Sequence, residues 1–305
     1  MIEPHSATVD ANGLCLHYLG WEPEQPAEGT QEDADAIPLV LLHGLGATAA
    51  SWQLLAERLC EQHFVLAFDL RGHGQSDKPE SGYDLATLAE DVVTGMATLG
   101  LGKVALVGHG WGARVALVLA ARHPALISQL VLVDCPHVEP RHWPGMTRER
   151  FIREMPPKAH YASRRAYLDA LRHDMSSFWS PAIESILATY IFDLPDGRVE
   201  ECLPAEQQRL IRAALWDDRA LSYYGKLTCP VLLVPAAAQP QSEAELPERL
   251  EHSDEFAVAK GYMAAQVARA IQHCSVLWMP DTAHDIQLQR PQVLAKAILD
   301  FVQYM

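Results

Sequence analysis

The stretch 108–112, which reads G-H-G-W-G, has the pattern of a turn that presents a catalytic nucleophile. It follows the apolar run 104–107 and opens a helical pattern over 113–122. Such a turn between strand and helix raises its central residue above the end of a sheet, where a Ser or an Asp attacks the substrate. Here the central residue is Gly110, which has no side chain. Covalent chemistry from position 110 is therefore excluded, and glycine adopts the positive φ of such a turn without strain.

Six short apolar runs are expected to build the sheet that positions this turn. Their hydrophobicity is continuous rather than alternating, which is typical of strands covered on both faces and hence of a parallel α/β sheet. The runs are 39–42, 64–68, 104–107, 130–133, 231–234 and 275–278. An antiparallel hairpin is predicted over residues 6–20, and the acidic stretch 22–36, rich in Gly and Pro, is predicted to be a loop.

The succession of apolar runs stops between about 136 and 225, where helix formers and aromatic side chains are frequent. We interpret segment 136–225 as a helical cap subdomain inserted into a core domain of residues 1–135 and 226–305. Aromatic side chains of a cap either line a ligand pocket or pack the cap onto the sheet. Trp143 and Trp179 are the candidates for substrate contact.

Composition and charge limit the partners. The net charge of −15 argues against nucleic acid and against an anionic membrane, because both require a basic patch. No apolar stretch approaches the roughly 20 residues that span a bilayer, and the N-terminus lacks the pattern of a secretory signal. Six cysteines without C-x-x-C spacing indicate free thiols in a reducing compartment. No metal-ligand or phosphate-loop pattern is present. We expect a cytoplasmic protein without metal or cofactor.

Three further motifs, in the same order, resemble those of the α/β-hydrolase superfamily. Residues 43–46 (HGLG) resemble its oxyanion loop, and residues 69–77 (DLRGHGQSD) resemble its D-x-R-G-x-G-x-S turn. Residues 281–284 (DTAH) precede the last helix, where the superfamily has its catalytic histidine. The resemblance covers nearly the whole chain. It implies an α/β-hydrolase fold, with a mostly parallel eight-stranded sheet flanked by helices and an inserted helical cap.

Within the superfamily, residues 108–115 look most like the elbow of epoxide hydrolases and haloacetate dehalogenases. That elbow typically reads G-H-D-x-G-x-R, with Asp as the nucleophile. The chain departs from it at Gly110, which replaces the Asp. It also departs at Gly46, because those families usually have a proline there.

The acid that follows the seventh strand in many members is replaced here by Gln239. Other members use an Asp after the preceding strand, and Asp134 fits that position; the alternative is that Asp134 only caps the turn into the cap. The resemblance thus predicts that Asp134 orients His284, which acts as a general base. Backbone N–H groups of Leu45 and Trp111 would stabilise the oxyanion.

Two further side chains carry weaker signals. Arg114 resembles one of the two arginines that clamp a carboxylate in haloacetate dehalogenases, although Trp111 occupies the other clamp position. A role of Arg114 in helix packing is equally open. His43 either contacts the substrate or braces the oxyanion loop by hydrogen bonds.

These residues together predict an enzyme of the α/β-hydrolase fold that acts on a small, largely apolar organic substrate without a covalent intermediate. Hydrolysis of an ester, lactone or epoxide and proton-transfer chemistry by a lyase, isomerase or cyclase are both open. A catalytically inactive binding or regulatory protein is the second hypothesis. The third is an inactivated variant of a hydrolase that had an Asp or Ser nucleophile. A homodimer is also left open.

Overall fold

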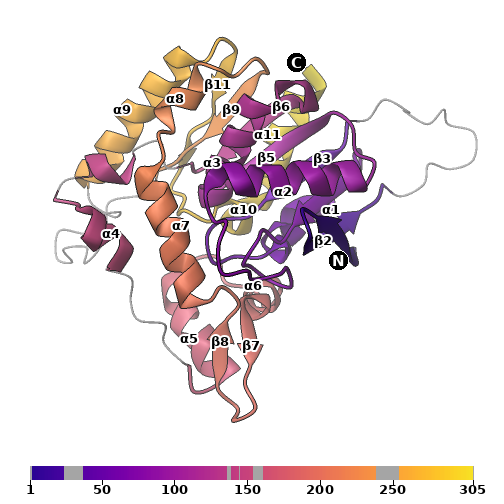
Figure 1. Cartoon of the computed structure of the whole chain (residues 1–305), viewed down its shortest axis with the longest axis vertical. Helices are drawn as coiled ribbons and strands as arrows, with labels where there is room; N and C mark the ends of the chain where they lie inside the picture. The colour runs from indigo at the N-terminus through magenta and orange to yellow at the C-terminus, as the bar shows by residue number, and fades with distance from the viewer. Residues whose placement is uncertain are drawn as a thin grey trace, which may run out of the picture.

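The apolar runs form one eight-stranded sheet in the computed structural model (Figure 1). The structure describes residues 2–23, 37–135, 139–143, 145–153, 161–237 and 254–304. The strand order is β1-β2-β4-β3-β5-β6-β9-β11, and every neighbouring pair from β4 to β11 is parallel. The strands are β1 His5–Ala11, β2 Leu14–Trp21, β3 Leu39–Leu42, β4 Val65–Phe68, β5 Val104–His109, β6 Ile127–Val133, β9 Val231–Val234 and β11 Cys274–Val276. The predicted α/β-hydrolase fold is confirmed.

The hairpin predicted over residues 6–20 is also confirmed, as strands β1 and β2. Its two-residue turn is Asn12-Gly13, with φ angles of 56° and 74°. Both angles are positive, which is the requirement of a tight hairpin turn and explains the Asn-Gly sequence. Strand β2 then pairs antiparallel with β4, so the hairpin forms one edge of the sheet.

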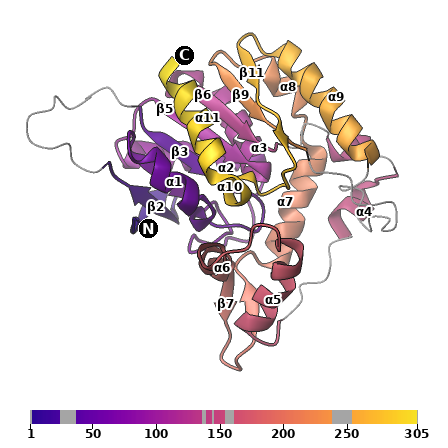
Figure 2. The ribbon, with the colours of Figure 1, turned by 180° about the vertical axis from the view of Figure 1, so that it is seen from behind.

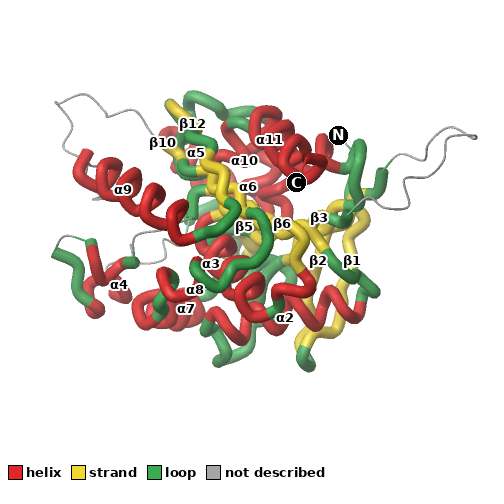
Figure 3. The backbone as a smooth tube through the Cα atoms, turned by 90° about the horizontal axis from the view of Figure 1, so that it is seen from above, coloured by secondary structure: helices red, strands yellow, loops and turns green. Residues whose placement is uncertain are grey.

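Helices cover both faces of the sheet (Figures 1 to 3). On one face α2 and α3 pack with part of α9, and on the other face α1, α10 and α11 pack together. These helices are α1 Gln53–Leu59, α2 Leu85–Thr98, α3 Gly110–Arg122, α9 Asp254–Ala270, α10 Ile286–Gln289 and α11 Pro291–Tyr304. None of the helices in the described residues is long and apolar enough to cross a membrane. None of the six cysteines forms a disulfide.

The segment predicted as a helical cap contains five helices in its described part (Figure 2). They are α4 Arg148–Arg153, α5 Arg164–Asp174, α6 Pro181–Leu187, α7 Ala205–Asp217 and α8 Leu221–Tyr224. It also contains an antiparallel hairpin, β7 Ile191–Asp193 and β8 Val199–Glu201, which the prediction of a purely helical cap missed. The hairpin turns at Gly197, whose φ is +84°.

The predicted cap segment contacts the rest of the chain by packing and by a hydrogen bond. Leu288 of α10 belongs to the buried cluster of α5, α6 and β7, and Leu54 of α1 packs against it. The Thr48 hydroxyl, directly after the predicted oxyanion loop, is 2.8 Å from the Thr189 hydroxyl of the cap. These contacts connect the cap with the loop that lies beside Gly110.

The last predicted strand, 275–278, forms differently. Strand β11 ends at Val276, and a second short strand, β12 Met279–Pro280, pairs with β10 Ala236–Ala237. Trp278 between them is 43% exposed, so this run is not covered on both faces as predicted. The β10–β12 pair carries the chain from the edge of the sheet back toward the end of β6, next to residue 134.

Candidate active site

Position 110 is the first residue of α3, directly after β5, as the turn pattern predicts. Gly110 has φ of +53°. Its flanking glycines are required by close backbone contacts. A Cβ atom on Gly108 would lie 2.5 Å from the Cα of Ala113, and one on Gly112 would lie 2.3 Å from the carbonyl oxygen of His43. The backbone of a nucleophile turn is therefore intact, although its reacting side chain is absent.

The imidazole of His284 lies against this position. A Cβ atom on Gly110 would lie 3.0 Å from Nε2 of His284 and 3.8 Å from the Cα of Gly44. Contacts between a Cβ and a ring nitrogen are seldom that short, so a side chain at 110 would push the imidazole outward. The structure thus brings the oxyanion loop, the start of α3 and His284 together around Gly110.

His284 is paired with Asp134, as predicted. Nδ1 of His284 is 2.6 Å from Oδ2 of Asp134. The other carboxylate oxygen accepts a hydrogen bond of 2.8 Å from the N–H of Ala236, and the carboxylate is buried. Asp134 has φ of +40°, an uncommon angle for a residue with a side chain and one that is often found at functional sites. With the proton of Nδ1 directed at Asp134, Nε2 is the basic nitrogen that faces Gly110.

His109, the residue before the elbow, supports the backbone of His284. Its Nε2–H donates to the carbonyl oxygen of His284 at 3.0 Å, and the two rings lie 4.5 Å apart. Burial, together with the nearby His284, lowers the pKa of His109 to about 4, so its ring is neutral at pH 7. A Cβ on Gly44 would lie 2.9 Å from Nδ1 of His109, which explains a glycine there. His109 therefore links the turn at 108–112 to the segment that carries His284.

His43 braces the oxyanion loop and has no hydrogen-bonding atom left for a substrate. Its Nε2 accepts from the N–H of Leu70 at 3.0 Å, so Nδ1–H donates to the carbonyl oxygen of Gly44 at 2.8 Å. Burial lowers its pKa. The predicted substrate contact of His43 is therefore replaced by a structural role.

Trp111 is buried on the inner side of the elbow. Its indole stacks on His73 with ring centres 5.0 Å apart, and His73 in turn lies 4.9 Å from His43. Burial lowers the pKa of His73 to about 3. The backbone N–H of Trp111 belongs to the first turn of α3, where amides have no partner within the helix. That amide and the amide of Leu45 in the adjacent loop remain our candidates for oxyanion binding.

Arg114 binds a protein carboxylate rather than lying open to a ligand. Its guanidinium is fully buried and lies 3.4 Å from Oδ2 of Asp218, which follows α7. Burial raises the pKa of Asp218, and the nearby negative charge of Glu139 adds to that rise. We assign Arg114 to the attachment of the cap to α3, in place of the predicted substrate contact.

The two predicted tryptophans have partners within the cap. Trp143 packs edge-on against Phe151, with ring centres 5.7 Å apart. The indole N–H of Trp179 donates to Glu184 at 3.2 Å, and the guanidinium of Arg172 lies 4.9 Å above its ring. The roles of Trp143 and Trp179 in substrate binding remain predictions. Gln239, which the sequence places after the seventh strand, lies outside the described residues.

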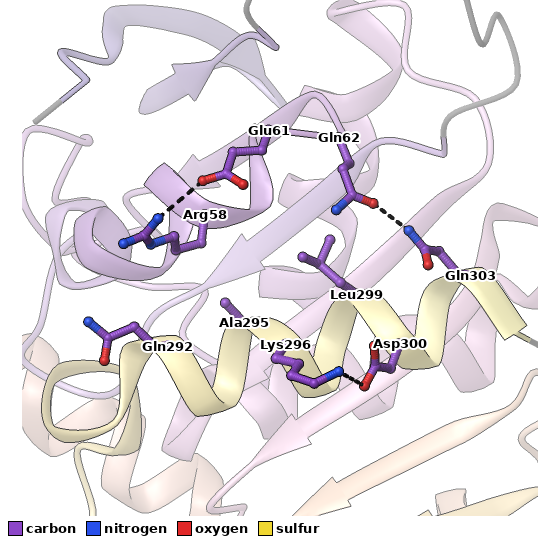
Figure 4. A pocket seen from close by; sticks show the side chains of 9 residues that line it. All are labelled: Arg58, Glu61, Gln62, Gln292, Ala295, Lys296, Leu299, Asp300 and Gln303. Atoms are coloured by element: carbon purple, nitrogen blue, oxygen red, sulfur yellow. Dashed lines mark hydrogen bonds and ion pairs between the residues drawn. The ribbon is translucent and has the colours of Figure 1, made fainter.

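The candidate site is open to solvent, since 57% of the His284 side chain is exposed. A groove of about 360 Å³ lies elsewhere, between α1 and α11, on the opposite face of the sheet from α3 (Figure 4). Its polar side chains are bound to each other, as in the pairs Arg58–Glu61 and Gln62–Gln303. The groove is therefore no part of the candidate site. Within the described ranges no three His, Cys, Asp or Glu side chains are grouped so as to hold a metal ion.

Comparisons with known proteins agree with the fold. A family model described as the alpha/beta hydrolase fold matches residues 37–156. A soluble epoxide hydrolase of Corynebacterium sp. (strain C12) is 36% identical over 133 residues, which are 44% of this chain and 42% of that protein. A 2-(acetamidomethylene)succinate hydrolase of Mesorhizobium japonicum is 40% identical over 104 residues, 33% of this chain and 37% of the relative.

These sequence matches thus span less than half of the length of the two curated relatives. The similarity in fold, in contrast, covers nearly the whole chain. The crystal structure of an E-2-(acetamidomethylene)succinate hydrolase superimposes with a TM-score of 0.76 and 22% identity over 99% of this chain and 100% of that one. The chain therefore has the α/β-hydrolase fold, and epoxide hydrolases are among the proteins to which its sequence is similar.

Proposed function

We propose that the protein is a hydrolase in which His284 activates water directly, without a covalent intermediate. One observation carries the proposal. The Asp134–His284 hydrogen bond of 2.6 Å is intact, while Nε2 of His284 faces a glycine instead of a nucleophile. A histidine held in one tautomer by a buried carboxylate is a general base, and with no serine or aspartate at 110 the group that it can deprotonate is water or the substrate itself.

In the proposed reaction, water between Nε2 and the substrate loses a proton to His284 as its oxygen bonds to the substrate carbon. The carbon–oxygen bond of the ester, lactone or epoxide then breaks, and the imidazolium of His284 returns the proton to the oxygen that departs. Asp134 stabilises the imidazolium that forms, because its carboxylate is buried and fixed by the Ala236 amide. The oxyanion develops near the N-terminus of α3, where the Trp111 and Leu45 amides would bind it. A positioned base supplies about 10²–10⁴-fold, and an oxyanion site without a nucleophile can retain about 10³–10⁴-fold over water. The proposed reaction uses no cofactor.

The proposed substrate is a small, largely apolar ester, lactone or epoxide. The names of the relatives support hydrolysis, since they describe an epoxide hydrolase and an enzyme that hydrolyses an acetamidomethylene succinate. Proton abstraction from the substrate, as in a lyase, isomerase or cyclase, would use the same base. We include in the proposal the cap of residues 136–225 over the core, and a cytoplasmic location.

A binding or regulatory protein without catalysis is the second candidate. The exposure of 57% of the His284 side chain favours it, because water screens the charges that such a site would stabilise. In that case a small molecule would bind at this site, and neither His284 nor Asp134 would take part in a reaction of it.

The test is turnover of one ester, one lactone and one epoxide: p-nitrophenyl acetate, dihydrocoumarin and styrene oxide. We expect His284→Ala to lower the rate on the preferred probe by about 10²–10⁴-fold. The matched control is His123→Ala, which removes a histidine bound to Glu90 at 3.0 Å on the surface and should leave the rate unchanged.

Equal rates for His284→Ala and the unchanged protein would refute the general base. Binding of a probe without turnover would favour the binding protein. A large gain of activity in Gly110→Asp or Gly110→Ser would instead indicate an inactivated nucleophile hydrolase.

A further inference from the structure

We propose that Ser6 is a second, separate nucleophile, which takes acyl groups from activated esters. Its hydroxyl oxygen is 2.9 Å from Nε2 of His17, and Nδ1 of His17 is 2.7 Å from Oδ2 of Asp69. Serine, histidine and aspartate thus stand in the order and at the distances of a nucleophile, its base and the acid that orients the base. These residues lie on β1, on β2 and directly after β4, and none of them belongs to the site around Gly110.

The hydrogen bonds of Asp69 fix the proton of His17. Asp69 accepts from the backbone N–H of Ala49 at 2.6 Å and from that of Gln75 at 2.9 Å. Burial alone would raise its pKa, but the hydrogen bonds from His17 and these amides hold the pKa below its ordinary value. The ionised carboxylate accepts the Nδ1–H of His17. Nε2 is then the basic nitrogen, and it accepts the hydrogen of the Ser6 hydroxyl.

The base is buried and the nucleophile is accessible. Ser6 pairs with Leu19 and Thr8 pairs with His17 across the hairpin, so the side chains of Ser6 and His17 are diagonal neighbours on the same face. Only 5% of the His17 side chain is exposed, whereas Ser6 is exposed. An ester can therefore reach the hydroxyl, while the base behind it is shielded from water.

The turn that covers His17 is rigid and carries a donor for the oxyanion. Arg71 makes a two-point ion pair with Asp91 of α2, at 2.7 and 2.8 Å, which holds the turn. The side-chain amide of Gln75 lies 3.4 Å from Nε2 of His17, beside the Ser6 hydroxyl. An amide N–H in this place can donate to an oxyanion that forms at an ester carbonyl bound to Ser6.

The reaction with p-nitrophenyl acetate balances without another reactant. The Ser6 oxygen forms a bond to the carbonyl carbon and its proton passes to Nε2 of His17. The carbon–oxygen bond of the leaving group breaks, p-nitrophenolate departs, and an acetyl ester remains on Ser6. Water then attacks the ester, His17 takes its proton, and acetate and the serine hydroxyl are released.

The experiment compares two exposed serines in the same folded protein. The hydroxyl of Ser222 donates to the carbonyl oxygen of Arg219 at 2.7 Å, and the structure gives it no histidine. After brief exposure to p-nitrophenyl acetate and an acid quench, peptide mapping by mass spectrometry counts the acetyl groups on each serine. We expect Ser6 to be acetylated on the order of 10²-fold faster than Ser222, because only Ser6 has a base.

Equal rates at the two serines would overturn the proposal, and this comparison needs no variant. Gln75→Ala changes an exposed side chain and should slow acetylation of Ser6 but not of Ser222. An unchanged ratio of the two acetylation rates would show that Gln75 does not bind the oxyanion. His17→Gln should reduce Ser6 to the rate of Ser222, provided that its thermal unfolding shows a folded protein. The result is independent of turnover at His284, so the two proposals can fail separately.

Discussion

The protein contains two histidine–aspartate pairs that have nearly the same geometry but different neighbouring residues. His284 and Asp134 are 2.6 Å apart, and His17 and Asp69 are 2.7 Å apart, in each case through Nδ1. Both aspartates are buried and each accepts at least one backbone amide. The pair itself therefore does not decide the chemistry.

The difference lies at the other nitrogen. Nε2 of His284 faces Gly110, and 57% of that side chain is exposed. Nε2 of His17 is bound to the hydroxyl of Ser6, and the imidazole is almost completely buried. The turn at residues 108–112 thus places a glycine opposite its histidine, whereas the hairpin places a serine beside its histidine. We infer direct hydrolysis at one pair and acylation at the other.

The largest effect is expected from Asp134→Asn. This substitution keeps the size of the side chain at position 134 but removes the carboxylate that orients His284. The amide would favour the wrong tautomer, and we expect turnover to fall toward the limit of about 10²–10⁴-fold that the positioned base supplies. Turnover of the preferred probe measures this. Because the amide donates where the carboxylate accepts, circular dichroism must show an unchanged fold. A folded variant with full turnover would show that Asp134 has no catalytic role.

A smaller effect is expected from Gly110→Ala. The added Cβ would lie 3.0 Å from Nε2 of His284 and would displace the imidazole. The imidazole needs to move by only a few tenths of an ångström, so we expect a loss of turnover below the roughly 10²-fold that a 1 Å misplacement can cause. The matched control is Gly197→Ala, where φ is +84° and a Cβ meets nothing within 4 Å.

Both glycine variants should lose about 1–3 kcal/mol of unfolding free energy from backbone strain. Only Gly110→Ala should also lose turnover. Equal turnover in the two variants would show that the contact between position 110 and His284 has no catalytic consequence.

The last prediction concerns the buried histidines between the two pairs and their effect on the unfolding free energy as the pH changes. His43 accepts from the residue after Asp69, His73 stacks next to it, and His109 binds His284. Burial lowers the pKa of His109 to about 4 and that of His73 to about 3, below the ordinary 6.5. Below pH 6.5 the unfolded chain therefore binds protons that the folded protein does not.

The stability from these rings is fully present above pH about 6.5 and is lost as the pH falls toward 4 for His109 and 3 for His73. For each of these two histidines, the unfolding free energy should fall by about 1.4 kcal/mol for every unit by which the pH is lowered in this window. Urea unfolding between pH 7 and 5 measures the slope. His73→Gln should flatten it, and exposed His5→Gln should not. A slope unchanged in His73→Gln would contradict neutral burial of that ring.

The sequence predicted the buried strands and the contact of His284 with Asp134. The continuous runs 39–42 and 231–234 became fully buried strands, because strands covered on both faces need apolar side chains throughout. The pairing of His284 with Asp134 followed from the resemblance, which predicts which strand ends meet. The structure bears out that contact, while its catalytic role awaits the experiments above.

Contacts between distant residues that no family motif indicates could not be predicted. Ser6, His17 and Asp69 meet only because the hairpin lies against the turn after β4, and no local pattern announces this. The same holds for Arg114, whose partner Asp218 is 104 residues away. The β7–β8 hairpin was missed because its strands have only three residues each and lie within a region rich in helix formers.

The central claim, direct attack by water at His284, is tested most directly by the first turnover. The experiment follows p-nitrophenolate release by rapid mixing in the Ser6→Ala variant, so that the hairpin serine contributes no burst. We predict linear product formation from the start, and no acetyl group on any peptide of residues 104–122 or 279–290. A burst equal to the enzyme concentration, with an acetyl group on either peptide, would show a covalent intermediate and contradict the account.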